Sequence, residues 1–334
     1  MILPTQRSKT PKSNLNFSNS LVQLANVWAK RYVRTVNQAQ SKSVKTTEMD
    51  MRQETAAVLN QGLRTVSVQA WAKTEALLSQ EVIRHQLQPD TVDPWAISGD
   101  VYQIYNFAFE SYAHDITPER FAVDVAPELG KIRAKFTAIE PRVIGFVSMQ
   151  FHYTGQYLLD LVPSSQRSLL QQYFKAIDDH LYMPLQRAYD AAASYSYGSP
   201  ELNIVQTLLP QSSAIAKQVV QQVIQAFPAH QCYSGSLSSE SVRLSSTRDA
   251  EMFQTYIWVC VLEKHIGVVQ QELFPLCVML YPTFNVRWEI VRYMLVLLER
   301  EFAQLLAPSE FVLCAPYLDS LKVMMAPEVF EDCA

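Results

Sequence analysis

Two glutamate–histidine pairs have a spacing that could hold a metal ion. Glu81 precedes His85 by four residues, and Glu110 precedes His114 by four. Side chains four residues apart lie on one face of a helix, so each pair could offer two ligands to a transition metal. Di-iron sites in helical bundles use Glu-x-x-His with partner glutamates on facing helices, and the sequence lacks that motif. We therefore predict ordinary carboxylate–imidazole contacts at both pairs and no bound metal.

A third histidine, His152, lies in the stretch Val143 to Leu159, which contains no acid, lysine or arginine. Together with Tyr153 and Gln156, it could bind a tetrapyrrole or another large planar ligand. A histidine in such surroundings is more often a core residue that hydrogen-bonds to a neighbouring helix. We predict the core residue and keep a tetrapyrrole or metal pocket beside His152 as the alternative.

Charged clusters occur at residues 178–180 (Asp-Asp-His) and 263–265 (Glu-Lys-His), near the expected ends of helices. We interpret both as solvated charge, because general acid–base catalysis requires a carboxyl group in a desolvated pocket. The sequence contains no GxGxxG, GxxxxGK, GxSxG or HExxH motif. Its five cysteines are widely spaced without a CxxC pair, which supports neither a zinc site nor a disulfide framework. Catalysis is therefore not indicated.

The elements that must position these residues are predicted to be helices. Apolar residues make up 49% of the 334 residues and charged residues 18%, while there are only 8 glycines. Sheet proteins use glycine at their many turns, so this composition favours an all-α fold. We predict a multi-helix globular bundle with proline at the corners of its helical hairpins.

The central hairpin is expected between Pro141 and Arg187. Apolar residues recur at helical spacing on both sides of the corner at residues 161–165. A later irregular stretch, 228–246, has seven serines between Ser234 and Ser246. Irregular segments of this length are uncommon and often functional, or else mark a boundary.

Residues 1–47 form a basic arm in this interpretation, and residues 48–334 form the helical domain, which could divide near 228–246. The arm contains eight Lys or Arg and no acid. It includes an amphipathic helix from about residue 19 to 36. This helix could be a first core helix, a partner-docking or interfacial helix, or part of a cleaved transit segment. The candidate partner-binding residues on it are Trp28, Lys30, Arg31, Tyr32 and Arg34.

The segments FVSMQFHYTGQYLLDLVP, YFKAIDDHLYMPLQRAYDAAA and QQELFPLCVMLYP resemble an all-helical cyanobacterial family without an assigned activity, over about residues 131–306. The resemblance implies a cytoplasmic protein with a role in regulating or assembling photosynthetic or related machinery. It provides no catalytic motif.

Three hypotheses follow. The first is a non-catalytic helical interaction protein that binds a protein partner, and no cofactor is predicted for it. The second is a ligand-binding protein or enzyme with a tetrapyrrole or metal pocket near His152. The third is contact of the basic arm with an anionic membrane or nucleic acid. No signal peptide and no run of about 18 apolar residues is apparent, so we expect a soluble cytoplasmic protein.

Overall fold

The structure, a computed structural model, describes residues 14–37 and 48–330. Apart from one short hairpin, the regular elements in these residues are helices, which confirms the predicted all-α class. The α-helices are α1 (Asn14–Asn37), α2 (Glu48–Arg84), α3 (Pro94–Ala113), α4 (Pro118–Thr137), α5 (Ile144–Asp160), α6 (Ser164–Tyr182), α7 (Leu185–Ala193), α8 (Pro200–Leu208), α9 (Ser212–Ala226), α10 (Glu240–Glu263), α11 (Phe274–Thr283), α12 (Trp288–Leu305) and α13 (Pro308–Met324). The short turns are the 3-10 segments η1 (Pro89–Thr91), η2 (Pro141–Val143) and η3 (Leu209–Gln211), and the π-helical turn η4 (Val269–Leu273).

The predicted central hairpin is formed by α5 and α6. Pro163 ends the corner between them and directly precedes the first residue of α6, where its missing N–H costs no hydrogen bond. The expected apolar positions of both helices are buried, with Phe151, Leu158, Leu170 and Ile177 at 0% exposure. The hairpin is therefore in the core, as predicted.

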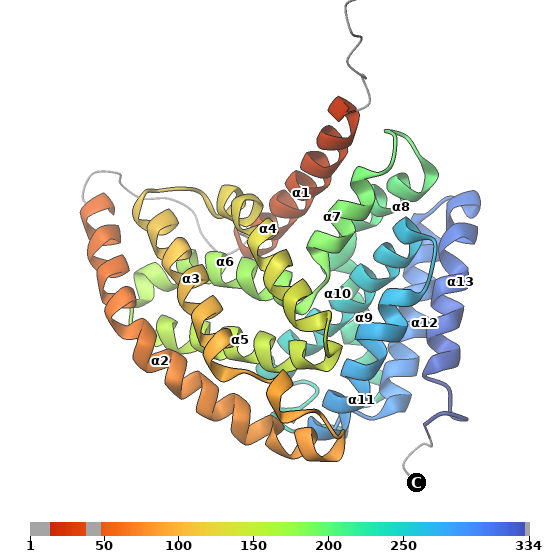
Figure 1. Ribbon diagram of the computed structural model, residues 1–334. Coiled ribbons are helices and arrows are strands. Elements are labelled where there is room, and N and C mark those ends of the chain that lie inside the picture. The colour runs from red at the N-terminus through yellow and green to blue at the C-terminus, as the bar shows by residue number, and fades with distance from the viewer. Residues whose placement is uncertain (1–13, 38–47, 331–334) are drawn as a thin grey trace, which may run out of the picture.

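Helices α1, α2, α3, α4, α7 and α11 pack against this hairpin, whereas α8, α9, α12 and α13 lie together on the other side of the molecule (Figure 1). The long helix α2 runs along one edge of the molecule and packs against α3 and α5. Helices α12 and α13 form the opposite edge. Helix α10 lies between α7 and α9 and contributes one of the longest buried runs, from Ala250 to Leu262.

The helix α1 lies in the range that was expected to form an arm, and it packs against α4, α6 and α7. Trp28 and Tyr32 are each 1% exposed, and the Tyr32 hydroxyl donates to the backbone oxygen of Gln172 at 2.7 Å. The described part of the arm is thus integrated into the core. Residues 38–47 lie outside the described residues, so the boundary at residue 47 stays a prediction.

Helix α2 is continuous through Gly62. A Cβ atom at Gly62 would lie 2.4 Å from Cδ1 of Leu161. The glycine therefore allows α2 to approach the end of α5 closely, and it does not break the helix.

Polar side chains determine where α3 and α10 begin. Helix α3 starts at Pro94, where the Asp93 side chain accepts hydrogen bonds from the amides of Trp95 and Ala96. Helix α10 starts at Glu240 rather than after Thr247. The hydroxyls of Ser245 and Thr247 bond to carbonyls four residues back, which lets polar residues continue a helix.

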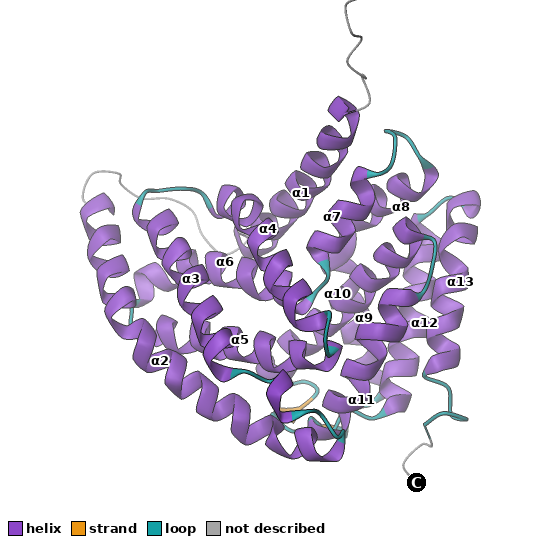
Figure 2. Cartoon of the chain, viewed as in Figure 1, coloured by secondary structure: helices purple, strands orange, loops and turns teal. Residues whose placement is uncertain are grey.

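The irregular stretch is accordingly shorter and contains a two-stranded antiparallel hairpin, β1 (Gln231–Cys232) and β2 (Gly235–Ser236), drawn in orange in Figure 2. Gly235 has φ +130°, a conformation that glycine adopts without strain. The hairpin lies against the end of α11, where the amide of Tyr233 donates to the Phe284 oxygen at 2.9 Å.

A buried ionic network joins the two halves of the chain. Arg133 of α4 contacts Glu272 of η4 at 2.9 Å, and Arg187 of α7 contacts the other carboxylate oxygen of Glu272 at 2.8 Å. Arg187 also forms a two-point ion pair with Glu263 of α10, at 2.6 and 2.9 Å. Such pairs fix the relative positions of helices because breaking one leaves a buried charge unpaired.

Candidate functional site

The site that the sequence singled out is centred on His152 of α5. Nδ1 of His152 lies 2.7 Å from Oδ2 of Asp178 on α6, and Nε2 lies 2.8 Å from the side-chain nitrogen of Gln156. Both ring nitrogens therefore have partners, as expected for a histidine that bonds to a neighbouring helix. The His152 side chain is still 33% exposed, so the site lies at the edge of the core.

Arg248 from α10 completes the charge distribution around this pair. Its Nη1 atom is 3.8 Å from Oδ2 of Asp178, and its guanidinium carbon is 4.2 Å from the ring centroid of Tyr182. Burial alone would raise the pKa of Asp178, but the nearby His152 and Arg248 outweigh burial and hold that pKa below its usual value. Asp178 is therefore a carboxylate paired with two groups.

The adjacent acid, Asp249, is in a different environment. It accepts a hydrogen bond from the Tyr182 hydroxyl. Burial raises the pKa of Asp249 to about 6, although Tyr182 and Arg248 oppose the shift. Two carboxyl groups in one site thus have pKa values displaced in opposite directions, as is common at functional sites.

A second set of charges involves α6, α1 and α10. Lys175 and Asp179 of α6 are 2.6 Å apart, and Arg31 of α1 lies 3.8 Å from Glu251 of α10. The interpretation of residues 178–180 as solvated charge was wrong, because Asp179 and His180 are each 1% exposed. One turn of α6 carries these residues inward, between the apolar residues Ile177 and Leu181.

His180 packs edge-on against Trp28, with ring centroids 4.5 Å apart. Burial lowers the pKa of His180 to about 4, despite its hydrogen bond to the Ala176 oxygen. The imidazole is therefore neutral at pH 7. It packs within the core and is not protonated for general acid catalysis.

The remaining two ligand-binding candidates, Gln156 and Tyr153, differ in exposure. Gln156 is exposed, and Tyr153 has the ammonium group of Lys73, from α2, 4.0 Å from its ring centroid. Burial, with a contribution from Tyr233 and Tyr157, raises the pKa of Tyr153 to about 12. This tyrosine is consequently a neutral phenol.

The candidate partner-binding residues of α1 do not share one surface. Trp28, Arg31 and Tyr32 are buried within the chain, whereas Lys30 is exposed. The side chain of Arg34 lies outside the described residues. Contact of the basic arm with a membrane or nucleic acid likewise concerns mainly residues that are not described, and it stays a prediction.

The first candidate metal pair forms the predicted carboxylate–imidazole contact, whereas in the second pair the histidine contacts a backbone oxygen. Nε2 of His85 lies 3.1 Å from a carboxylate oxygen of Glu81, and Nδ1 of His114 lies 2.7 Å from the backbone oxygen of Glu110. Within residues 14–37 and 48–330, no three His, Cys, Asp or Glu side chains are grouped as a metal site requires. None of the helices in these ranges is long and apolar enough to span a membrane.

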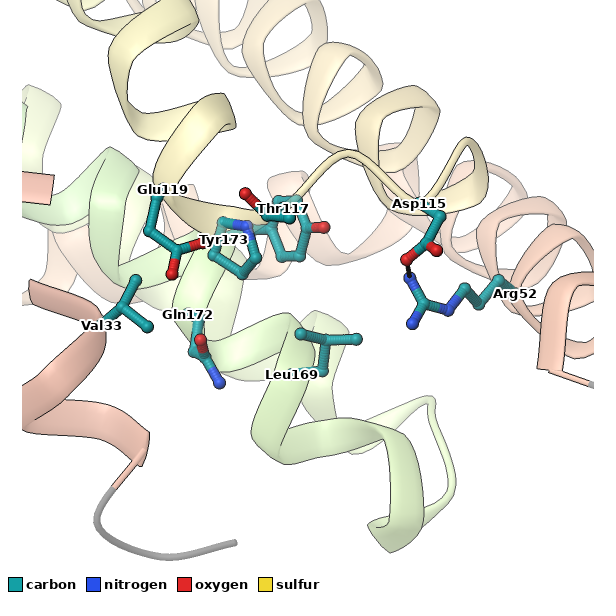
Figure 3. Close-up of a pocket in the computed structure, with 9 residues that line it drawn as sticks. Val33, Arg52, Asp115, Thr117, Glu119, Leu169, Gln172 and Tyr173 are labelled. Atoms are coloured by element: carbon teal, nitrogen blue, oxygen red, sulfur yellow. Dashed lines mark hydrogen bonds and ion pairs between the residues drawn. The ribbon is translucent and has the colours of Figure 1, made fainter. Parts of the chain in front are cut away.

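Two hollows occur elsewhere on the surface. The first, shown in Figure 3, has a volume of about 230 Å³ and contains the ion pair of Arg52 with Asp115, 2.5 Å apart, near Glu119 at the start of α4. The second measures about 480 Å³ and is formed by residues 226–231 with Asn285 and Arg287. Ligand pockets usually measure about 300–1,000 Å³, so the first is small. Neither includes His152, Tyr153 or Gln156.

The arrangement at His152 can bind and orient polar groups, but it lacks a nucleophile. In the part of the chain that is described, no hydroxyl or thiol lies within hydrogen-bond distance of His152. Two buried atoms of the site, Nε of Arg248 and Oδ1 of Asp178, have no hydrogen-bond partner among these residues. They are the groups most available to a ligand or a water molecule.

Sequence reasoning missed Arg248, Asp249 and Tyr182. A signal was present in the sequence. Arg248 and Asp249 directly precede the stretch 250–262, whose one charged residue is Glu251. Charged residues next to a long buried stretch need partners on a neighbouring helix, because a buried charge without a partner is costly. Which partners these are depends on the packing of α6 against α10.

Together, the fold and the site define an all-helical protein with an internally paired charge network. The family described as "Phycobilisome protein" matches residues 172–325, which is less than half of the chain. The match begins within α6 and ends after α13, and it overlaps the region 131–306 in which the sequence resembled an all-helical family. The matched segment is therefore phycobilisome-like and related to photosynthesis. No curated protein and no solved structure matches the chain significantly.

Proposed function

We propose that this chain is a non-catalytic helical protein that binds partners in the photosynthetic machinery, in a regulatory or assembly role. The observation that carries the proposal is the match of residues 172–325 to the phycobilisome protein family. Shared ancestry in this segment would explain both the helical architecture and a role in assembly with other proteins.

The geometry around His152 supports binding in preference to catalysis. Its charges are paired with one another, and the buried groups His180 and Tyr153 are neutral at pH 7 for the reasons given above. General base catalysis would require a group poised next to a nucleophile. Internally paired charges instead fix the helices that present the outer surface.

Sedimentation of the full-length protein with isolated phycobilisomes tests the proposal. We expect the protein to move with the complexes through a sucrose gradient and to stay at the top of the gradient in their absence. A protein of the same size and charge from an unrelated family is the control. Full-length protein that remains at the top in both gradients would contradict the proposal.

A tetrapyrrole-binding role is the second candidate, and the family match is in keeping with it. The site fits such a ligand only in part. Nε of Arg248 and Oδ1 of Asp178 could hold polar groups of a ligand, but both ring nitrogens of His152 are already engaged. A tetrapyrrole held through His152 would have to displace Gln156 or Asp178.

Absorbance spectra of the purified protein titrated with biliverdin or haem test this candidate. Saturable spectral shifts that are lost in the Arg248→Ala variant would support it. Spectra that equal the sum of protein and free pigment would rule it out.

A further inference from the structure

A hollow of about 480 Å³ lies between the end of α9 and the start of α12. It is the second of the two hollows described above, and it is lined by residues 226–231 together with Asn285 and Arg287. Its volume is within the range of about 300–1,000 Å³ that ligand pockets usually have. The proposed function does not use it.

Hydrogen bonds join the two chain segments that form this hollow. Nε2 of the buried His230 side chain lies 2.8 Å from the backbone oxygen of Asn285, and the Asn285 amide donates to the Gln231 oxygen at 2.5 Å. Because a carbonyl oxygen only accepts, His230 donates through Nε2. Phe227 packs edge-on against Tyr293 of α12, with ring centroids 5.8 Å apart. The hollow is thus formed before a ligand arrives, which lowers the entropic cost of binding.

Arg287 gives the hollow a positive charge. No Asp, Glu or Lys is among the described residues that line it. One nitrogen of the guanidinium, Nη2, pairs with Glu289 in the first turn of α12, and the Arg287 side chain is 36% exposed. Its Nε atom is buried and has no hydrogen-bond partner in the described part of the chain. An unsatisfied buried N–H is costly, and an acceptor oxygen on a ligand would satisfy it.

The start of α12 also favours an anion. Arg287 is the N-cap residue, and no side chain caps the helix there. The first amides of such a helix can bind an anion, and the helix dipole favours negative charge at this end. A guanidinium group beside these amides matches the two oxygens of a carboxylate or a phosphate. The polar part of the hollow therefore selects an oxyanion.

Most of the remaining lining is apolar. Ala226, Phe227, Pro228 and Ala229 follow one another at the end of α9. Inorganic phosphate would leave these side chains in water, whereas an organic acid would cover them with its own apolar surface. An organic carboxylate thus fits the lining better than a phosphate ion does.

We propose that this hollow binds an organic carboxylate, with the carboxylate group on Arg287 and the start of α12 and the apolar part against Phe227 and Pro228. The proposal goes beyond the proposed function, because it holds whether or not the chain binds phycobilisomes. Two sources share this chemistry, namely a free organic acid and the C-terminal carboxylate of another polypeptide.

Saturation-transfer NMR of the full-length protein with phenylacetate tests the proposal. We expect saturable binding with a dissociation constant of about 1 mM, which is a usual strength for a ligand of this size. The neutral analogue phenylacetamide should bind at least about 10-fold more weakly, because it cannot form a charged hydrogen bond with the guanidinium. Inorganic phosphate at the same concentration should not displace phenylacetate.

Variants of the lining assign the binding to this hollow. Arg287→Gln removes the cation and Ala229→Leu fills the hollow without touching Arg287, so each should weaken phenylacetate binding at least about 10-fold. Arg287→Lys keeps the charge without the planar fork and should give an intermediate affinity. Arg300 is an exposed arginine near the other end of α12, so Arg300→Gln should bind like the wild type.

The capped dipeptide acetyl-glycyl-phenylalanine distinguishes the two sources, because it places a similar group beside a C-terminal carboxylate. Tighter binding of the dipeptide than of phenylacetate would assign the hollow to the C-terminus of a partner, and the reverse order to a free acid. Circular dichroism melting shows that each variant folds. The proposal is overturned if the wild type does not bind phenylacetate saturably, or if folded Arg287→Gln and Ala229→Leu proteins bind it as tightly as the wild type.

Discussion

Asp249 and His180 make opposite contributions to the pH dependence of stability. The pKa of Asp249 is raised by burial to about 6, so between about pH 4 and 6 the folded state binds more protons than the unfolded state and stability falls as the pH rises. The pKa of His180 is lowered by burial to about 4. Between about pH 4 and 6.5 the unfolded state therefore binds more protons at this site, and stability rises with pH.

The two effects offset each other in the wild type, and a single substitution should reveal one of them. Asn resembles the protonated form of Asp249 and can still accept from Tyr182. We expect Asp249→Asn to raise the free energy of unfolding at pH 7.5 by on the order of 2 kcal/mol, because a pKa shift of one unit corresponds to about 1.4 kcal/mol. The gain should vanish near pH 4. Urea unfolding at several pH values measures it.

Asp50→Asn is the control for this measurement, since Asp50 is an exposed acid of α2 that also loses a negative charge. A gain from Asp249→Asn that is the same at pH 4.5 and pH 7.5 would contradict the assigned cause. A loss of stability at pH 7.5 would show that Arg248 needs the charged form of Asp249.

At the scale of the elements, glycine occupies two helical positions for different physical reasons. A Cβ atom at Gly155 of α5 would lie 2.7 Å from the Tyr105 hydroxyl, which bonds to the Phe151 oxygen at 2.8 Å. A Cβ atom at Gly99 of α3 would meet nothing within 4 Å. Gly155 therefore permits helix contact, while Gly99 only weakens its helix.

We expect Gly155→Ala to lower the free energy of unfolding by about 1–2 kcal/mol, because overpacking displaces a buried hydroxyl. Gly99→Ala should raise it by about 0.5–1 kcal/mol through helix propensity. Chemical unfolding of the two variants side by side checks the signs. Equal effects of both substitutions would mean that the contact of α5 with Tyr105 is looser than the distances indicate.

The elements themselves could be predicted well from the sequence. The 3.6-residue periodicity between Pro141 and Arg187 identified α5 and α6 and their buried faces, because apolar spacing reports directly which side of a helix faces the core. Helix starts were less accurate. Asp93 caps α3, and serine hydroxyls that bond to backbone carbonyls continue α10 across a stretch that looked irregular.

The candidate site could be predicted only in part. His152 was identified by its uncharged neighbourhood, and its bond to another helix was expected. Asp178 and Arg248, its partners, were not assigned, because contacts between residues 26 and 96 positions apart depend on packing that no local pattern encodes.

On the scale of the whole molecule, α1 is part of the helical core, where it packs against α4, α6 and α7. Its buried face includes Leu24, Trp28 and Tyr32, and Arg31 faces Glu251 within the core. An arm that merely carried positive charge would not need these contacts. Removal of this helix exposes an apolar surface on α4 and α7 and leaves Glu251 without that cation.

We therefore expect deletion of residues 1–47 to lower the apparent Tm strongly, since truncation of a single buried Trp typically costs about 3–5 kcal/mol. Thermal melting followed by near-ultraviolet circular dichroism measures the change. The full chain carrying Lys30→Ala, at an exposed position of the same helix, should melt like the wild type. A truncated protein with an unchanged Tm would favour a separable arm.

The π-helical turn η4 sets a limit on how this chain can be dissected. A π-helical turn accommodates one more residue than an α-helical turn would. In η4, Glu272 lies between Arg133 and Arg187. Arg133 precedes the family-matched segment, whereas Arg187 lies within it. A fragment cut to residues 172–325 would keep the acid and lose one of its two cations. We therefore expect the matched segment to be less stable on its own than within the whole chain, because part of a buried charge would lose its partner.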